Sequence, residues 1–120
     1  MQGKLKDHFY SHIGKAKALI ESDRLDEAFS VLEVAHVLGQ RYLIPHTISH
    51  LYMLKVGLLK CDAKEVFGQL FRIPTGFMGS IIGVFPTGNT GGSNISPFKS
   101  LGIPEDIQRI INQKSGKNNE

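Results

Sequence analysis

A chain of 120 residues, 41% of them hydrophobic and 21% charged, has the size and composition of one soluble domain with a modest core. Its net charge of +3 is spread along the chain without a basic block, so we expect no nucleic-acid-binding surface. The single cysteine, Cys61, excludes an intramolecular disulfide.

The sequence also indicates whether the protein spans a membrane and in which compartment we expect it. The N-terminal residues contain no apolar run of signal-peptide length. The most apolar stretch, residues 77–85, is too short to span a bilayer and holds two glycines. A single cysteine fits a reducing compartment. We therefore expect a cytoplasmic protein without a membrane span.

Two helices are predicted for the first third of the chain. Apolar residues recur at intervals of three and four over residues 4–22 and again over about 24–38, where Gly39 marks the end. The small residues that would allow these helices to approach closely are Ala16, Ala28 and Ala35. The pair has the pattern of a tetratricopeptide-type hairpin, although one hairpin is not the stacked array that stabilises that fold.

A third and a fourth helix follow. Pro45 suits the first turn of a helix that ends near Cys61. Asp62 and Glu65 have the spacing of a capping box for the next helix. The apolar positions of that helix are Val66, Phe67, Leu70, Phe71 and Ile73. Pro74 must end or kink it, because proline lacks a backbone N–H and clashes with the preceding turn.

The last third of the chain is more irregular. Residues 85–98 have the Gly, Asn and Pro content of a loop, and a short final helix opens at 103–106 and ends near Asn112. We predict an all-α fold: a small bundle of about four helices with a tetratricopeptide-like N-terminal hairpin, a Gly/Asn-rich loop and a short last helix. One domain is expected over residues 1–113, followed by a disordered tail at 114–120.

Histidines gather between residues 33 and 50. His46 and His50 are one helical turn apart, and Glu33 and His36 form an E-x-x-H step on the preceding helix. In helical bundles such spacings point carboxylates and imidazoles at one ion. The helical projection turns these side chains inward. The pattern makes Glu33, His36, His46 and His50 candidate ligands of a zinc or iron ion. For the pair His8 and His12, near the chain end, a partly solvated face is expected.

A second interpretation needs no metal. A buried histidine can donate to a backbone carbonyl, and a Glu–His network alone would fix the helix packing. The protein would then be a tetratricopeptide-like adaptor, with apolar residues around 77–85 contacting a partner protein or a second copy. An enzyme ranks below both interpretations, because no catalytic partner is visible beyond Glu33.

The Gly/Asn-rich loop around residues 86–94 also has two interpretations. Successive backbone N–H groups can form a nest for an anion, yet the same composition is typical of a multiple turn, which we favour. If a small ligand binds near the histidines, the loop would close over it. The candidate contacts are Gln40, Arg41, Asn89, Thr90, Gly91, Gly92 and Asn94. Asn89 and Asn94 are also expected to tie the loop to the helices.

Three short patterns together carry a resemblance. They are A-H-x-L-G-Q at residues 35–40, H-x-x-x-H at 46–50 and G-N-T-G-G-x-N at 88–94. In this order they resemble a small bacterial family known only as a domain of unknown function, over about residues 25–107. The resemblance implies a shared fold and groups the histidines with the loop. It implies no activity, and the pair at residues 8 and 12 is outside its pattern.

Overall fold

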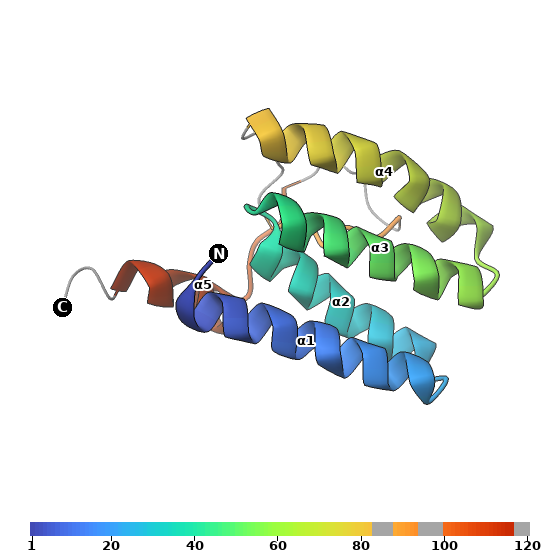
Figure 1. Cartoon of the computed structure of the whole chain (residues 1–120), viewed down its shortest axis with the longest axis horizontal. Helices are drawn as coiled ribbons and strands as arrows, with labels where there is room; N and C mark the ends of the chain where they lie inside the picture. The colour runs from blue at the N-terminus through green and yellow to red at the C-terminus, as the bar shows by residue number, and fades with distance from the viewer. Residues whose placement is uncertain (83–87, 94–99, 117–120) are drawn as a thin grey trace.

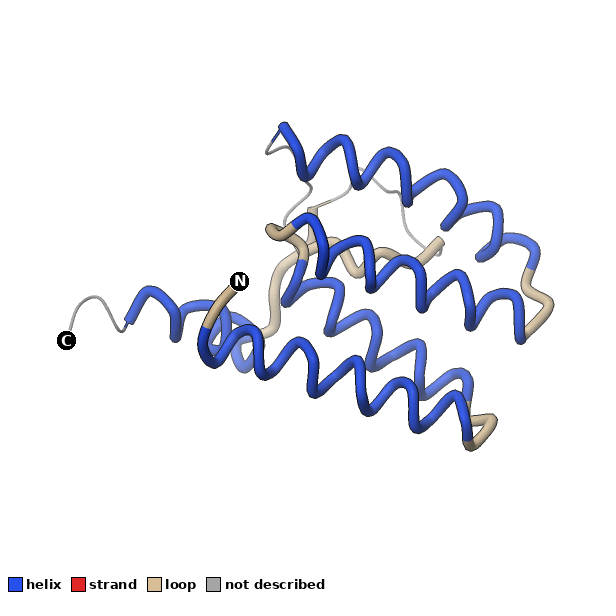
Figure 2. The backbone as a smooth tube through the Cα atoms, viewed as in Figure 1, coloured by secondary structure: helices blue, strands red, loops and turns tan. Residues whose placement is uncertain are grey.

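The computed structural model describes residues 1–82, 88–93 and 100–116. Over these ranges the chain forms helices and no strand, which confirms the predicted all-α fold (Figures 1 and 2). The helices are α1 (Gly3–Glu21), α2 (Leu25–Gly39), α3 (Leu43–Leu59), α4 (Ala63–Ile82) and α5 (Glu105–Gly116). None of them is both long enough and apolar enough to cross a membrane.

Helices α1 to α4 lie side by side in chain order and run in alternating directions (Figure 1). Helix α2 packs between α1 and α3, and α5 covers one end of α1 and α2. Helix α4 is at the edge of the array: of the described helices it packs only on α3. This arrangement gives α2, α3 and α4 one shared interior next to the loop at residues 88–93.

The turns between α1 and α2 and between α3 and α4 each contain a left-handed residue. Asp23 and Cys61 have φ angles of 57° and 54°, a conformation that ends a helix within one residue. Asp62 Oδ1 then accepts a hydrogen bond from Glu65 N at 3.1 Å, which confirms half of the predicted capping box. The Glu65 carboxylate does not complete it, because it accepts hydrogen bonds from Gln69 and from Ser93 N instead.

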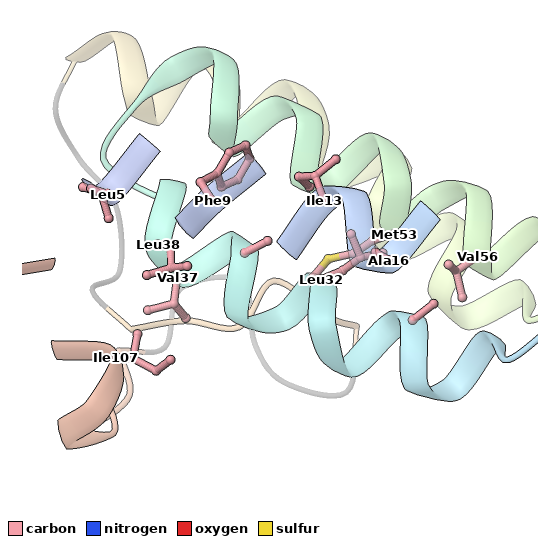
Figure 3. Packing of buried hydrophobic residues seen from close by; sticks show 12 residues of the cluster. Leu5, Phe9, Ile13, Ala16, Leu32, Val37, Leu38, Met53, Val56 and Ile107 are labelled. Atoms are coloured by element: carbon pink, nitrogen blue, oxygen red, sulfur yellow. The ribbon is translucent and has the colours of Figure 1, made fainter. Parts of the chain in front are cut away.

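The apolar core lies between α1, α2 and α3 (Figure 3). Helix α1 contributes Leu5, Phe9 and Ile13, one turn apart, against Leu32 of α2 and Met53 of α3. The three alanines expected to allow close approach are fully buried. Gly39 is required at the corner between α2 and α3, because a Cβ there would lie 2.7 Å from Pro45 Cβ and 2.9 Å from Phe9 Cε2.

Two predicted boundaries differ from the structure. Of the two effects predicted for Pro74, an end of the helix is wrong, because α4 continues to Ile82. Pro74 is exposed, so solvent can reach the helix where the proline removes a backbone donor. Helix α5 runs to Gly116, whereas the sequence predicted an end near Asn112. The domain boundary at residue 113 stays a prediction, and residues 117–120 of the expected tail lie outside the described ranges.

The apolar residues expected to bury α4 are the main disagreement. Phe67, Leu70 and Phe71 are more than half exposed. The buried side chains of this helix include Glu65, Gln69 and Arg72. The usual assignment of the apolar stripe to the core is therefore wrong for α4, and its polar stripe faces the interior.

Candidate metal centre

Three buried histidines from two helices meet at one point. His36 comes from α2, and His46 and His50 come from successive turns of α3. Their Nε2 atoms are 3.0 Å (36–46), 3.1 Å (36–50) and 3.1 Å (46–50) apart. The ring planes are inclined at 51–75° to one another, so the rings converge tip to tip rather than stack. The convergence that the helical spacing predicted is confirmed for these three residues.

The triangle of nitrogens has the dimensions of a metal-binding face. A zinc ion about 2.0–2.1 Å from each Nε2 would subtend N–metal–N angles of about 95–100°, between octahedral and tetrahedral values. Such an ion would lie outside the plane of the three nitrogens and keep at least one further coordination position.

The opposite nitrogens of two rings are held by hydrogen-bond acceptors. His36 Nδ1 donates to the backbone carbonyl of Asn89 at 2.6 Å. His50 Nδ1 donates to Gln69 Oε1, also at 2.6 Å. The orientation of the Gln69 amide is fixed in turn, because its Nε2 donates to Glu65 Oε2 and to the carbonyl of Gly91, each at 2.8 Å. A neutral ring that donates from Nδ1 carries its lone pair on Nε2.

The electrostatic environment keeps the three rings neutral. Burial lowers the pKa of His36 well below its ordinary 6.5, and His50 and His46 lower it further. Burial lowers the pKa of His46 to about 4. For His50, burial and the neighbouring His46 lower the pKa to about 3, and the positive charge of Arg72 acts in the same direction. Neutral imidazole is the form that binds a metal ion, so protons compete little at neutral pH.

Two glycines allow the backbone to approach the rings. A Cβ on Gly91, whose φ is +86°, would lie 2.6 Å from His36 Cδ2. A Cβ on Gly76 of α4 would lie 3.5 Å from His46 Nε2 and 3.7 Å from His50 Nε2. Glycine at position 76 therefore leaves the space beside two of the three nitrogen tips free of side-chain atoms.

A family model described as a protein of unknown function, DUF3703, matches residues 3–111, which include every residue of this cluster. The chain belongs to the DUF3703 family. This confirms the resemblance to an uncharacterised family. No curated protein and no solved structure matches the chain.

Glu33 does not join the histidines in this DUF3703 domain. Among the described residues, the group with ligand atoms within 4.8 Å of one another consists of the three histidines. The half-buried Glu33 carboxylate instead accepts a hydrogen bond from the Thr90 side chain. Burial raises the pKa of Glu33, and that hydrogen bond opposes the shift. A role for Glu33 as a ligand therefore stays a prediction.

The loop at residues 88–93 packs its polar groups against the helices. Asn89 and Gly91 present their carbonyls to His36 and Gln69, as described above. Gly88 N donates to Gln40 Oε1 at 3.0 Å. The Asn89 side chain accepts from Gly91 N within the loop at 2.9 Å. These contacts make the loop an outer shell of the histidine cluster.

The remaining predicted contact residues are more scattered. Gly92 is buried in the same loop, whereas Asn94 lies outside the described residues. Gln40 and the exposed Arg41 line a cavity of about 120 Å³ between the start of α1, the end of α2 and α5. His8 and His12 are half-buried on α1, where His12 Nδ1 donates to the His8 carbonyl at 2.7 Å.

Gln69 and Glu65 are parts of the site that were not predicted from the sequence. Both are buried on α4, and Gln69 links His50, Glu65 and the loop. The available signal was the spacing of Glu65, Gln69 and Arg72, which lie four and three residues apart and so form one polar stripe. On a helix with an apolar stripe on its other side, such residues are usually assigned to the solvent face.

Proposed function

We propose that this DUF3703 domain binds one transition-metal ion, zinc or ferrous iron, through Nε2 of His36, His46 and His50. The observation that carries the proposal is the triangle of nitrogens 3.0–3.1 Å apart, with two of the opposite ring nitrogens held by acceptors. Metal-binding histidines commonly donate their second ring nitrogen to a carbonyl or carboxyl oxygen, which fixes the tautomer and the ring orientation.

Without a metal ion, the Nε2 lone pairs of His36 and His50 compete for one donor. The Nε2 atoms of His36 and His50 are 3.1 Å apart, and both carry a lone pair because the protons of these rings are on Nδ1. A neutral His46 can place at most one N–H in the triangle, which satisfies one neighbour well. A buried acceptor left unpaired costs about 1–3 kcal/mol. A cation at the centre would be a partner for all three nitrogens at once.

The chemistry of the donors favours zinc or ferrous iron over calcium or magnesium, which prefer oxygen ligands. Three neutral ligands leave the charge of a divalent ion uncompensated within the triangle. Glu33 remains our candidate for an additional ligand, and it would have to exchange its Thr90 hydrogen bond for the metal. The cytoplasmic location expected from the sequence would keep iron in its ferrous state.

The test compares two histidine pairs with the same spacing. We would purify the untagged protein, remove metal with a chelator and titrate it with zinc, ferrous iron and cobalt, using the cobalt absorption spectrum as the readout. The wild type is expected to take up one equivalent. The double substitution His46→Ala/His50→Ala is expected to abolish uptake, whereas His8→Ala/His12→Ala, also an i, i+4 pair, retains it.

Two results would overturn the proposal. The first is a wild type that takes up none of the three metals, which would favour the adaptor interpretation with structural histidines. The second is unchanged uptake in the His46→Ala/His50→Ala protein, which would place the metal elsewhere. Far-UV circular dichroism of both variants checks that the helices are retained.

A further inference from the structure

Helix α4 exposes an apolar stripe that no other described part of the chain covers. Six of its large apolar side chains are between 42% and 71% exposed: Phe67, Leu70, Phe71, Phe77, Met78 and Ile81. At 100° per residue they occupy one continuous face. The helix is at the edge of the array, and α3 is the one described helix that packs on it (Figure 1).

The opposite face of α4 explains why the stripe points outward. That face carries Glu65, Gln69 and Arg72, each less than 10% exposed, followed by Gly76 against the histidines. Gln69 orients His50, and Glu65 holds the loop through Ser93 N. The interior contacts therefore fix the rotation of α4, and the apolar side chains are left in water.

The exposed area is large for an isolated chain. With roughly 200 Å² for a fully exposed large side chain, the stripe leaves on the order of 600 Å² of surface in water. That is the upper end of the largest apolar patch on a typical monomer, about 300–600 Å². Two such stripes in contact would bury on the order of 1,200 Å², which is within the range of specific interfaces. Neighbouring α3 also exposes Leu51 and Leu58, one heptad apart.

The spacing along the stripe fits another helix. Residues 67, 70, 74, 77 and 81 alternate steps of three and four, which is the a/d pattern of a helix–helix seam. A membrane surface fits less well, because amphipathic membrane helices carry Lys and Arg along their polar face. On α4 the cations are Lys64 and the buried Arg72, and no charged residue follows until Lys99.

We propose that two copies of this chain associate through the α4 stripe as a symmetric dimer, so that α3 and α4 of both copies form a four-helix bundle. A stripe that contacts its own copy about a two-fold axis is the isologous arrangement common in homodimers. Pro74, midway between residues 67 and 81, would lie next to the axis whether the two helices run parallel or antiparallel. The dimer needs no bound metal, so it does not rest on the function proposed above.

The mass in solution tests this directly. We would measure the full chain by light scattering and analytical ultracentrifugation over a range of concentrations, in chelator to exclude association bridged by metal. The wild type is expected at twice the 13.3 kDa of one chain. Phe71→Glu and Met78→Glu, each made separately, are expected to weaken the dimer at least about tenfold through burial of like charges across the axis. Tyr10→Glu, on an exposed apolar residue of α1, is the matched control and remains dimeric.

A cross-link supplies a second readout that does not depend on a destabilising charge. In a Cys61→Ser background, Pro74→Cys is expected to form a disulfide-linked dimer on mild oxidation, whereas Tyr10→Cys is not. A wild type that is monomeric at every concentration would overturn the proposal, as would a Phe71→Glu protein that dimerises as strongly as the wild type. A monomer that binds vesicles of equal parts phosphatidylcholine and phosphatidylglycerol would also overturn it, in favour of a membrane surface.

Discussion

Replacing Gly91 by alanine measures how tightly the loop is held against the histidine cluster. Two costs follow from the structure. The φ of +86° lies in the left-handed region, which costs an L-residue with a Cβ about 1–2 kcal/mol. The new Cβ would also lie 2.6 Å from His36 Cδ2 and 2.9 Å from its Nε2, an overlap of the kind that costs about 1–3 kcal/mol in a packed core.

A smaller gain opposes these costs, because alanine restricts the unfolded chain and so stabilises by about 0.4–1 kcal/mol. The net expectation is a loss of about 2–4 kcal/mol in the free energy of unfolding, a large share of the 5–15 kcal/mol typical of a domain. Urea unfolding in chelator, followed by circular dichroism, would show this as a midpoint lower by about 1–3 M.

Gly14 supplies the matched control. It lies within α1, and a Cβ there would meet nothing within 4 Å. Gly14→Ala is therefore expected to stabilise by about 0.5–1 kcal/mol, the ordinary gain in a helix interior. If Gly91→Ala were as stable as the wild type, the loop would not pack on His36, and the argument that its carbonyls orient the rings would fail.

Three further predictions concern the cluster itself. Gln69→Leu removes the acceptor of His50 Nδ1 and should lower the zinc affinity, measured by calorimetry, about 10–100-fold. An unchanged affinity would contradict the role of Gln69 in orienting His50. Acid should destabilise the metal-free protein: the folded pKa values of His46 (about 4) and His50 (about 3) are below the unfolded 6.5, so stability is full above 6.5 and falls as pH drops toward 4. The loss is on the order of 1 kcal/mol per pH unit. Urea midpoints that stay equal between about pH 7 and 5 would contradict the lowered pKa values. Gly76→Ala should leave the unfolding free energy of the metal-free protein within about 1 kcal/mol of the wild type, because the higher helix propensity of alanine offsets its tight contact with His46. The same substitution should weaken zinc binding. A zinc titration that matches the wild type would show that the space beside the nitrogens is not used.

The histidine cluster could be predicted from the sequence because helical geometry sets the relative positions of residues on the same helix. An i, i+4 pair such as His46 and His50 shares one face wherever the helix lies. His36 falls within the apolar stripe of its own helix, so its inward direction was also predictable. Glu33 shows the limit of this reasoning. Spacing places its Cα near that of His36, but the loop arriving from more than fifty residues away supplies Thr90 as its partner.

Helix α4 could not be placed correctly, because the apolar-stripe rule assumes that apolar residues face the core. Here the interior facing α4 is itself polar: it contains three imidazoles and a loop of backbone carbonyls and N–H groups. Those groups need polar partners when they are buried, which Glu65 and Gln69 provide. The need for polar partners arises only where α2, α3 and the loop meet in three dimensions. The polar stripe on α4 does not by itself show that it faces the interior.

The two proposals therefore share one cause. If α4 were rotated to bury Phe67 and Phe71, the amide of Gln69 would leave His50, and the Glu65 carboxylate would leave Ser93 N. Each lost buried partner costs about 1–3 kcal/mol, whereas apolar surface can be covered by a second copy at no cost to the site. A polar site beside the edge helix of a small helical array thus requires the polar face of that helix, so its apolar face is turned to solvent.

A variant that lacks the cluster, with leucines at positions 36, 46 and 50, would remove the reason for this orientation of α4. Its dimer is expected to weaken, although no residue of the α4 stripe has changed; a dimer as strong as that of the wild type would separate the two features.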